Sequence, residues 1–226
     1  MNGIIVYKIA IYLANFAAIL IAIPFHEFAH AFAAVRCGDM TPKFSGRYTL
    51  NPFAHFDPLG FLMMVFLRFG WAKPVPVNPA NFRNYKAGCI LVSIAGVLTN
   101  LVLAVLFCPL CLISYKFLIP YDWAIYLNDF IQAFFLAAFY LNNGLFVFNL
   151  LPLYPLDGFR LYESLSSRRG KVWYFLRNKS FYILIAILLL GVIADYVGIP
   201  YLDIIGFLRE LAARPIILLW RTILGL

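Results

Sequence analysis

Charged residues are scarce in this chain of 226 amino acids, of which 12% are Asp, Glu, Lys or Arg. A soluble domain carries about 25% charged residues, so the composition excludes an ordinary soluble protein. Hydrophobic residues make up 64% of the chain and gather in long runs, which predicts an integral membrane protein. Acidic residues are fewer than basic ones, 10 against 18, and the formal net charge is +8. The basic residues stand in short segments between the apolar runs, as membrane orientation requires, so no nucleic-acid partner is expected.

Cysteine and histidine are also few. The four cysteines show no disulfide framework. Cys108 and Cys111 flank Pro109 within an apolar run, and they are expected to be small apolar packing residues rather than a redox or zinc pair. There are three histidines, and two of them stand four residues apart in the stretch His26-Glu27-Phe28-Ala29-His30.

This stretch predicts a metal site. Residues four apart lie one above the other on a helix, so His26 and His30 can offer two imidazole nitrogens to one ion. Glu27 lies about 100° further round, near enough to reach a water on that ion. Zn²⁺ commonly takes such a set, with a third protein ligand and an open position for water. The flanking residues are almost all apolar, and histidines and carboxylates within a membrane helix usually mark a functional site.

The apolar runs predict an all-α polytopic membrane protein with five to six transmembrane or re-entrant segments. Four segments are long enough to span the bilayer: residues 3–36, 87–117, 123–151 and 180–197. Residues 1–226 are expected to form a single domain, with a catalytic core of about residues 1–160 and accessory C-terminal helices at 179–226.

The remaining segments are harder to assign. Residues 60–69 are apolar but too short to span, and they are expected to form a re-entrant limb or a half-helix. Residues 201–226 fit either a broken span or an interfacial helix. A small β-like, membrane-associated region is expected near residues 40–80, because residues 43–49 alternate like a strand and residues 71–79 are punctuated by proline.

Charge predicts the orientation. Residues 160–179 hold six basic residues and one acidic residue, so this segment is expected to be cytoplasmic. Counting back through the spans places the N-terminus outside the cell. His26, His30 and Asp157 then all fall toward the cytoplasmic ends of their helices. The expected location is the inner (plasma) membrane, crossed several times, with the active site toward the cytoplasmic side.

A site with two histidines needs a third ligand, and the chain offers five candidates: Asp157, Asp129, Glu163, Asp195 and His55. Asp129 and Asp195 fall toward the outer ends of their spans, and Glu163 lies in the basic loop. Asp157 stands where a span meets the cytoplasmic side, and it is the best fit.

The motifs together resemble a known family. His26-Glu27-Phe28-Ala29-His30, followed in a later span by Asn149-x-x-Pro152-x-x-Pro155-Leu156-Asp157-Gly158, is similar to the site-2 protease family of intramembrane zinc metalloproteases (peptidase family M50). The segments Asn51-Pro52-x-x-His55-x-Asp57-Pro58-x-Gly60 and Gly70-Trp71-Ala72-Lys73-Pro74-Val75-Pro76-Val77-Asn78-Pro79 resemble its compact prokaryotic branch, which lacks PDZ and CBS domains. The match covers about residues 20–160. It departs from the family pattern at Val97, where proline is frequent, and at Phe159, where a small residue is common.

The resemblance implies one zinc ion per chain, bound by His26, His30 and Asp157, with Glu27 as the general base. It implies hydrolysis of peptide bonds in or near transmembrane segments, within the lipid bilayer. The substrate would be a single-span membrane protein, such as an anti-sigma factor, or a leftover signal peptide. A helical substrate must unwind, because its own turns shield each carbonyl. The strand-like region could hold the unwound segment by edge pairing. The sequence makes no prediction about oligomeric state.

Three further residues have open roles. Asn149 and Asn100 either hydrogen-bond the oxyanion or the substrate backbone, or serve as helix caps and helix–helix contacts. His55 has three interpretations: a fourth zinc ligand, a residue that hydrogen-bonds near the metal or in a substrate loop, or an ordinary loop histidine.

Two other functional classes compete with the protease. A metal-binding membrane transporter would also carry intramembrane His and Asp residues. However, transporters tend to show internal repeats with sites at the midplane, and this chain shows no repeat. A non-hydrolytic scaffold of the same fold is the other alternative, and the presence of Glu27 argues against it.

Overall fold

The computed structural model describes residues 2–60, 63, 72–117, 125–166 and 169–226. The described part of the chain is mostly helical and contains no β-strand. Its principal helices are α1 (Asn2–Cys37), α2 (Thr41–Phe44), α4 (Tyr85–Phe117), α5 (Ile125–Leu150), α6 (Asp157–Leu165), α7 (Lys171–Val197) and α8 (Ile204–Leu224). Short 3₁₀ turns lie at η1 (Pro52–Ala54), η2 (Pro79–Asn81) and η4 (Pro200–Leu202).

Four of these helices, α1, α4, α5 and α7, are long and apolar enough to cross a membrane. The predicted all-α polytopic membrane fold is therefore confirmed. Helix α1 runs through Pro24 without a break, as expected. Helix α7 begins at Lys171, nine residues before the predicted start at residue 180. Its first turns are rich in basic residues, which lower the hydropathy, but they contain no proline to interrupt a helix.

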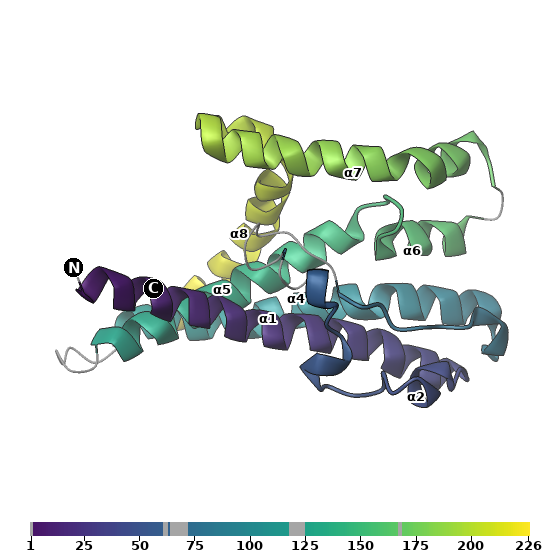
Figure 1. Ribbon diagram of the computed structural model, residues 1–226, viewed down its shortest axis with the longest axis horizontal. Coiled ribbons are helices and arrows are strands. Elements are labelled where there is room, and N and C mark those ends of the chain that lie inside the picture. The colour runs from purple at the N-terminus through teal and green to yellow at the C-terminus, as the bar shows by residue number, and fades with distance from the viewer. Residues whose placement is uncertain (1, 61–62, 64–71, 118–124, 167–168) are drawn as a thin grey trace.

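The helices α1, α4 and α5 lie side by side and form the centre of the molecule (Figure 1). Small residues let them approach closely: Ala14, Ala18 and Ala22 follow one face of α1 at a spacing of four, and none is exposed. In a membrane, where lipid tails are as apolar as Leu, close packing of small residues is what favours such contacts. Helix α7 runs along one side of the molecule, and α8 connects it to the bundle (Figure 1).

Most of the stretch 201–226 forms one continuous helix, α8, which passes through Pro215. Its buried residues Ala213 and Ile216 pack against residues of α4 and α5. The indole Nε1 of Trp220 donates to the carbonyl oxygen of Val105 at 2.9 Å. These contacts place α8 against the membrane-spanning helices rather than apart from them.

The strands expected at residues 43–49 are absent, so that part of the β-like prediction is wrong. Residues 41–44 form the short helix α2, with Pro42 in its first turn, where proline is well tolerated. Polar and apolar residues do alternate here, but they form one turn of helix followed by turns and bends. The segment 72–78 is extended as predicted, yet it forms one isolated antiparallel bridge, Phe56 to Ala72, and no ladder among the described residues. The re-entrant segment predicted at residues 60–69 lies almost wholly outside the described residues.

Asp39 holds these loops together just beyond the end of α1. Its fully buried carboxylate accepts hydrogen bonds from the backbone and hydroxyl of Thr41, from the side chain of Asn81 and from the backbone N–H of Asn78. Burial alone would raise the pKa of Asp39, but these hydrogen bonds outweigh burial and hold that pKa below its usual value. An ionised carboxylate therefore fixes one end of the extended segment 72–78.

Candidate metal centre

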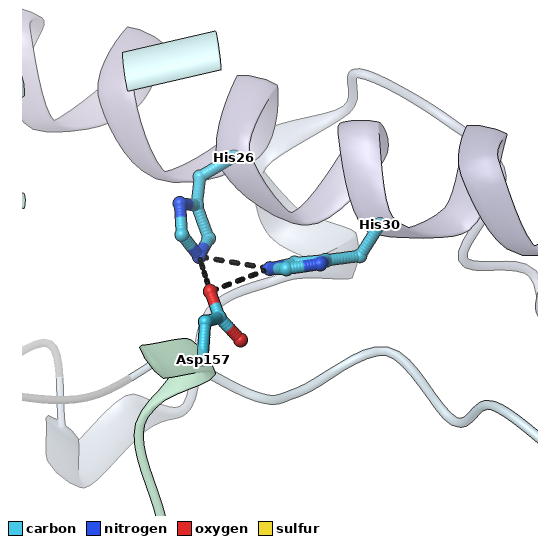
Figure 2. Close-up of side chains that lie close together, drawn as sticks. All are labelled: His26, His30 and Asp157. Atoms are coloured by element: carbon cyan, nitrogen blue, oxygen red, sulfur yellow. Dashed lines mark hydrogen bonds and ion pairs between the residues drawn. The ribbon is translucent and has the colours of Figure 1, made fainter. Parts of the chain in front are cut away.

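Three side chains, two from α1 and one from the start of α6, converge on one point (Figure 2). His26 and His30 project from successive turns of α1, and their Nε2 atoms are 3.0 Å apart. Asp157, the first residue of α6, places its Oδ2 atom 3.3 Å from Nε2 of His26 and 3.1 Å from Nε2 of His30. All three residues are buried. Two segments more than a hundred residues apart in sequence thus bring two nitrogens and one oxygen to a single point.

The hydrogen bonds behind the rings determine which nitrogen faces that point. Nδ1 of His30 lies 2.7 Å from the carbonyl oxygen of Val92, and Nδ1 of His26 lies 2.6 Å from Oδ1 of Asn100. Because both partners are acceptors, each neutral imidazole carries its proton on Nδ1 and presents a bare lone pair at Nε2. Two lone pairs and a carboxylate oxygen then face one another, an arrangement that a cation stabilises.

The donor set fits zinc. Oδ2 of Asp157 is buried and has no hydrogen-bond partner among the described residues, and such an atom is costly unless something neutralises it. Two imidazoles and one carboxylate are the ligands that catalytic zinc sites use, with one position left open.

Local packing positions Asp157. A Cβ at the next residue, Gly158, would collide with the backbone carbonyls of Leu150 and Leu151, so glycine allows α6 to begin directly against the end of α5. Phe159, which departs from the family pattern, is fully buried and has ring contacts with neighbouring aromatic side chains, including Trp173 of α7. This anchor holds the first turn of α6, and therefore Asp157, in place.

A glycine on α4 provides the space for both rings. A Cβ added at Gly96 would lie 2.6 Å from Cε1 of His26 and closer still to Nε2 of His30. The backbone of α4 therefore lies directly against the two imidazoles. Sequence reasoning missed this role, although the Gly96-x-x-x-Asn100 spacing, which places both residues on one helix face, was a usable signal.

Glu27 lies beside the metal-binding group and is half-buried. Its Oε2 accepts a hydrogen bond from the backbone N–H of Val75 at 3.1 Å, so the extended segment 72–78 crosses α1 at the site. Glu27, His26, His30 and Asp157 all line one cavity of about 1120 Å³, to which this segment also contributes. Sequence reasoning did not foresee the contact between Val75 and Glu27, because it is made by a main-chain group.

The two asparagines have different positions. Asn100 is fully buried behind His26, and its Nδ2 donates to Oδ1 of Asn142 on α5 at 2.9 Å. It touches the imidazole rather than the cavity, so a direct contact with substrate is not retained for it. Asn149 does line the cavity, and its Nδ2 donates to the carbonyl oxygen of Leu145 at 3.1 Å.

The other proposed ligands lie elsewhere. His55 is fully buried, its Nε2 lies 2.7 Å from the carbonyl oxygen of Thr49, and its own carbonyl accepts from the N–H of Lys73. It is not part of the metal-binding group, so the fourth-ligand interpretation is not retained. Glu163 accepts a hydrogen bond from Trp173, and Asp129 lines a second cavity. Asp195 lies near the end of α7.

The fold and the site together define a multi-pass membrane protein with a His-His-Asp metal centre. Comparison with known proteins identifies the family. The sequence model of Peptidase family M50 matches residues 123–192, which include Asp157. A Bacillus subtilis (strain 168) protein named "Putative zinc metalloprotease YwhC" is 37% identical over 165 residues, covering 73% of this chain and 74% of that protein.

A second relative is "Putative zinc metalloprotease Rip2" of Mycobacterium tuberculosis. It is 32% identical over 148 residues, which cover 64% of this chain and 54% of that protein. No solved structure matches this chain. The chain belongs to peptidase family M50 and is a zinc metalloprotease, as the resemblance predicted.

Proposed function

We propose that this metalloprotease hydrolyses peptide bonds in or near the transmembrane segments of other membrane proteins. The observation that carries the proposal is the position of His26, His30 and Asp157, which line a cavity whose walls come largely from membrane-spanning helices. A substrate that is itself a membrane helix reaches such a cavity from within the bilayer. The substrates we propose are single-span membrane proteins or leftover signal peptides.

The chemistry divides between the metal and the chain. His26, His30 and Asp157 would hold zinc, which when bound would act as a Lewis acid on a water and on the scissile carbonyl. Glu27 accepts the proton of the attacking water and then donates it to the departing amine. The hydrogen bond from Val75 occupies one carboxylate oxygen of Glu27 and leaves the other for this transfer. The groups behind the rings, Asn100 and the carbonyl of Val92, keep both imidazoles in the ligand tautomer.

Two features support binding of an unwound substrate. Four residues of the extended segment 72–78 line the cavity: Ala72, Pro74, Val75 and Val77. An extended backbone beside the metal can pair with an extended substrate backbone, which exposes a carbonyl that a helix would shield. We also assign Asn149 to this step, because the second N–H of its amide can donate to the substrate backbone or to the oxyanion.

We further propose that the metal centre lies toward the cytoplasmic side of the plasma membrane, with the N-terminus outside. The start of α7, which belongs to the basic segment 160–179, lies at the same end of the bundle as the end of α1 (Figure 1). Basic residues favour the cytoplasmic side.

Cysteine labelling tests this orientation. Gly170 and Tyr201 are both exposed and flank the two ends of α7. An impermeant maleimide is expected to label Tyr201→Cys in intact cells, and to label Gly170→Cys only in inside-out vesicles. The wild type, whose cysteines are buried or half-buried, gives the background. The reverse labelling pattern would contradict the proposed orientation.

Metal removal tests the function itself. The purified protein in detergent is expected to contain about one zinc ion per chain and to cleave a synthetic single-span peptide. A chelator such as 1,10-phenanthroline should abolish cleavage, and added zinc should restore it. Metal analysis by mass spectrometry and analysis of the peptide products provide the two measurements. A zinc-loaded protein that cleaves no transmembrane peptide would favour the transporter or scaffold alternatives.

A further inference from the structure

The cavity at the metal centre continues far along α1. Its wall on that helix includes Lys8, Tyr12, Ile19, Ile23 and His30. Lys8 and His30 are 22 residues apart, which on a helix is about 33 Å, close to the roughly 30 Å thickness of the hydrocarbon core. The cavity therefore has the length of a whole transmembrane helix, and residues far from the metal can contact the side chains of a substrate helix.

An arginine of another helix, Arg209 of α8, also lines this cavity away from the metal. It lines a second cavity of about 420 Å³ as well. Its Cδ atom lies near Gly144 of α5, and its guanidinium carbon is 5.5 Å from the ring centroid of Tyr140. Because α8 packs against α4 and α5, this charge lies among the membrane-spanning helices.

Arg209 has no acidic partner in the part of the chain that the structure describes. Asp129 and Glu210 share the second cavity with it, but neither lies within the 4.0 Å of an ion pair. Its Nε atom is buried and has no hydrogen-bond partner among the described residues. A charge among membrane helices normally pairs with an opposite charge or with backbone carbonyls. The ring of Tyr140 supplies only a cation–π contact.

The position of Arg209 relative to the metal follows from two neighbouring asparagines on α5. Asn142 hydrogen-bonds Asn100, which hydrogen-bonds His26, while Asn143 donates to the carbonyl oxygen of Arg209 at 2.7 Å. The backbone of Arg209 is therefore close to the level of the metal centre. Its side chain lies by Tyr140, one turn toward the other end of the cavity, where Asn15 also lines the wall. Asn15 and His26 are eleven residues apart, about 16 Å along α1.

We propose that Arg209 determines substrate specificity by pairing with an acidic side chain in the transmembrane segment of the substrate. This inference rests on the proposed intramembrane proteolysis. A carboxylate on the substrate helix, one to three turns from the scissile bond, supplies the partner that Arg209 lacks. A planar guanidinium can donate two parallel hydrogen bonds to a carboxylate, and opposite charges that both lie among membrane helices are less costly paired than apart. The protease therefore prefers transmembrane segments that carry a membrane-embedded Asp or Glu.

A peptide pair tests this preference. The purified, zinc-loaded enzyme is given synthetic single-span peptides that differ at one position, Asp in one and its isostere Asn in the other. The position is scanned over one to three turns on each side of the scissile bond. At one register we expect the wild type to cleave the Asp peptide with about tenfold higher kcat/KM than the Asn peptide. With Arg209→Gln the ratio should fall to about one, and with Arg209→Lys part of the preference should return.

The ratio separates recognition from a structural role. A merely structural arginine would lower the cleavage of both peptides together and leave their ratio unchanged, and this result would overturn the inference. Arg214→Gln is the matched control, because Arg214 lies on the same helix but is exposed, and it should keep the wild-type ratio. Equal cleavage of both peptides by the wild type at every register would also overturn the inference, while leaving the proposed function standing. If no peptide of either kind were cleaved, both would fail.

Discussion

Replacing Glu27 with glutamine is expected to abolish peptide cleavage while about one zinc ion per chain stays bound. The amide of glutamine has the shape of the carboxylate but cannot take a proton from water, so the variant loses general-base catalysis. We expect a loss of about 10³-fold or more in kcat, near the range of a single general base. None of the ligands His26, His30 and Asp157 is altered. The new side chain can still accept the hydrogen bond from Val75, so the segment 72–78 should keep its place.

The measurements are metal content and cleavage of a transmembrane peptide on the same preparation. Glu163→Gln is the matched control, because Glu163 lies on α6 and accepts a hydrogen bond from Trp173 that glutamine can also accept. It should cleave like the wild type. Cleavage by a zinc-loaded Glu27→Gln variant at the wild-type rate would remove Glu27 from the mechanism.

Gly96→Ala is expected to remove both zinc and activity through a single methyl group. The added Cβ would lie 2.6 Å from Cε1 of His26 and would also collide with His30. Neither ring can withdraw easily, because Asn100 and the carbonyl of Val92 hold their Nδ1 atoms. The ligands must separate or α4 must move away from α1. Changes that misorient metal ligands typically cost 10- to 100-fold in affinity, and we expect at least about 100-fold here.

Zinc titration of the metal-free protein measures this effect directly. Gly170→Ala is the control, since a Cβ there meets nothing within 4 Å and its φ of −85° suits any residue. It should bind zinc and cleave peptide normally. Wild-type zinc affinity in Gly96→Ala would show that α4 does not pack against the metal ligands as the structure has it.

Much of this arrangement could be predicted from the sequence, because it follows from periodicity and hydropathy. A spacing of four places His26 and His30 on the same face of a helix, whatever residues surround them. Asp157 could be proposed because it combines a carboxylate with a position at the end of a span, and the structure brings it to the two rings. The long helices follow from their apolar runs. The start of α7 was predicted too late, because basic residues lower the hydropathy of its first turns although no proline interrupts the helix there.

The parts that escaped prediction depend on groups that sequence patterns do not display. The N–H of Val75 and the carbonyl of Val92 are main-chain groups, and their partners depend on tertiary structure. Gly96 acts through the absence of a side chain, which leaves no chemical signature. Residues 43–49 alternate like a strand, but the carboxylate of Asp39 and the ring of Pro42 commit the preceding residues to a helical turn. These local interactions outweighed the strand-like alternation of the sequence.

The extended segment at the metal centre is tethered on both sides of Glu27, the proposed general base. Lys73 is bonded to the carbonyl of His55, and Asn78 is bonded to Asp39, with Val75 and its contact to Glu27 between them. The position of Glu27 is thus fixed by residues that belong to polar connecting loops. A chimaera that exchanges residues 38–57 for those of a relative would need to bring its own acceptors at both tethers, or the graft would misalign the carboxylate of Glu27 without altering a single metal ligand.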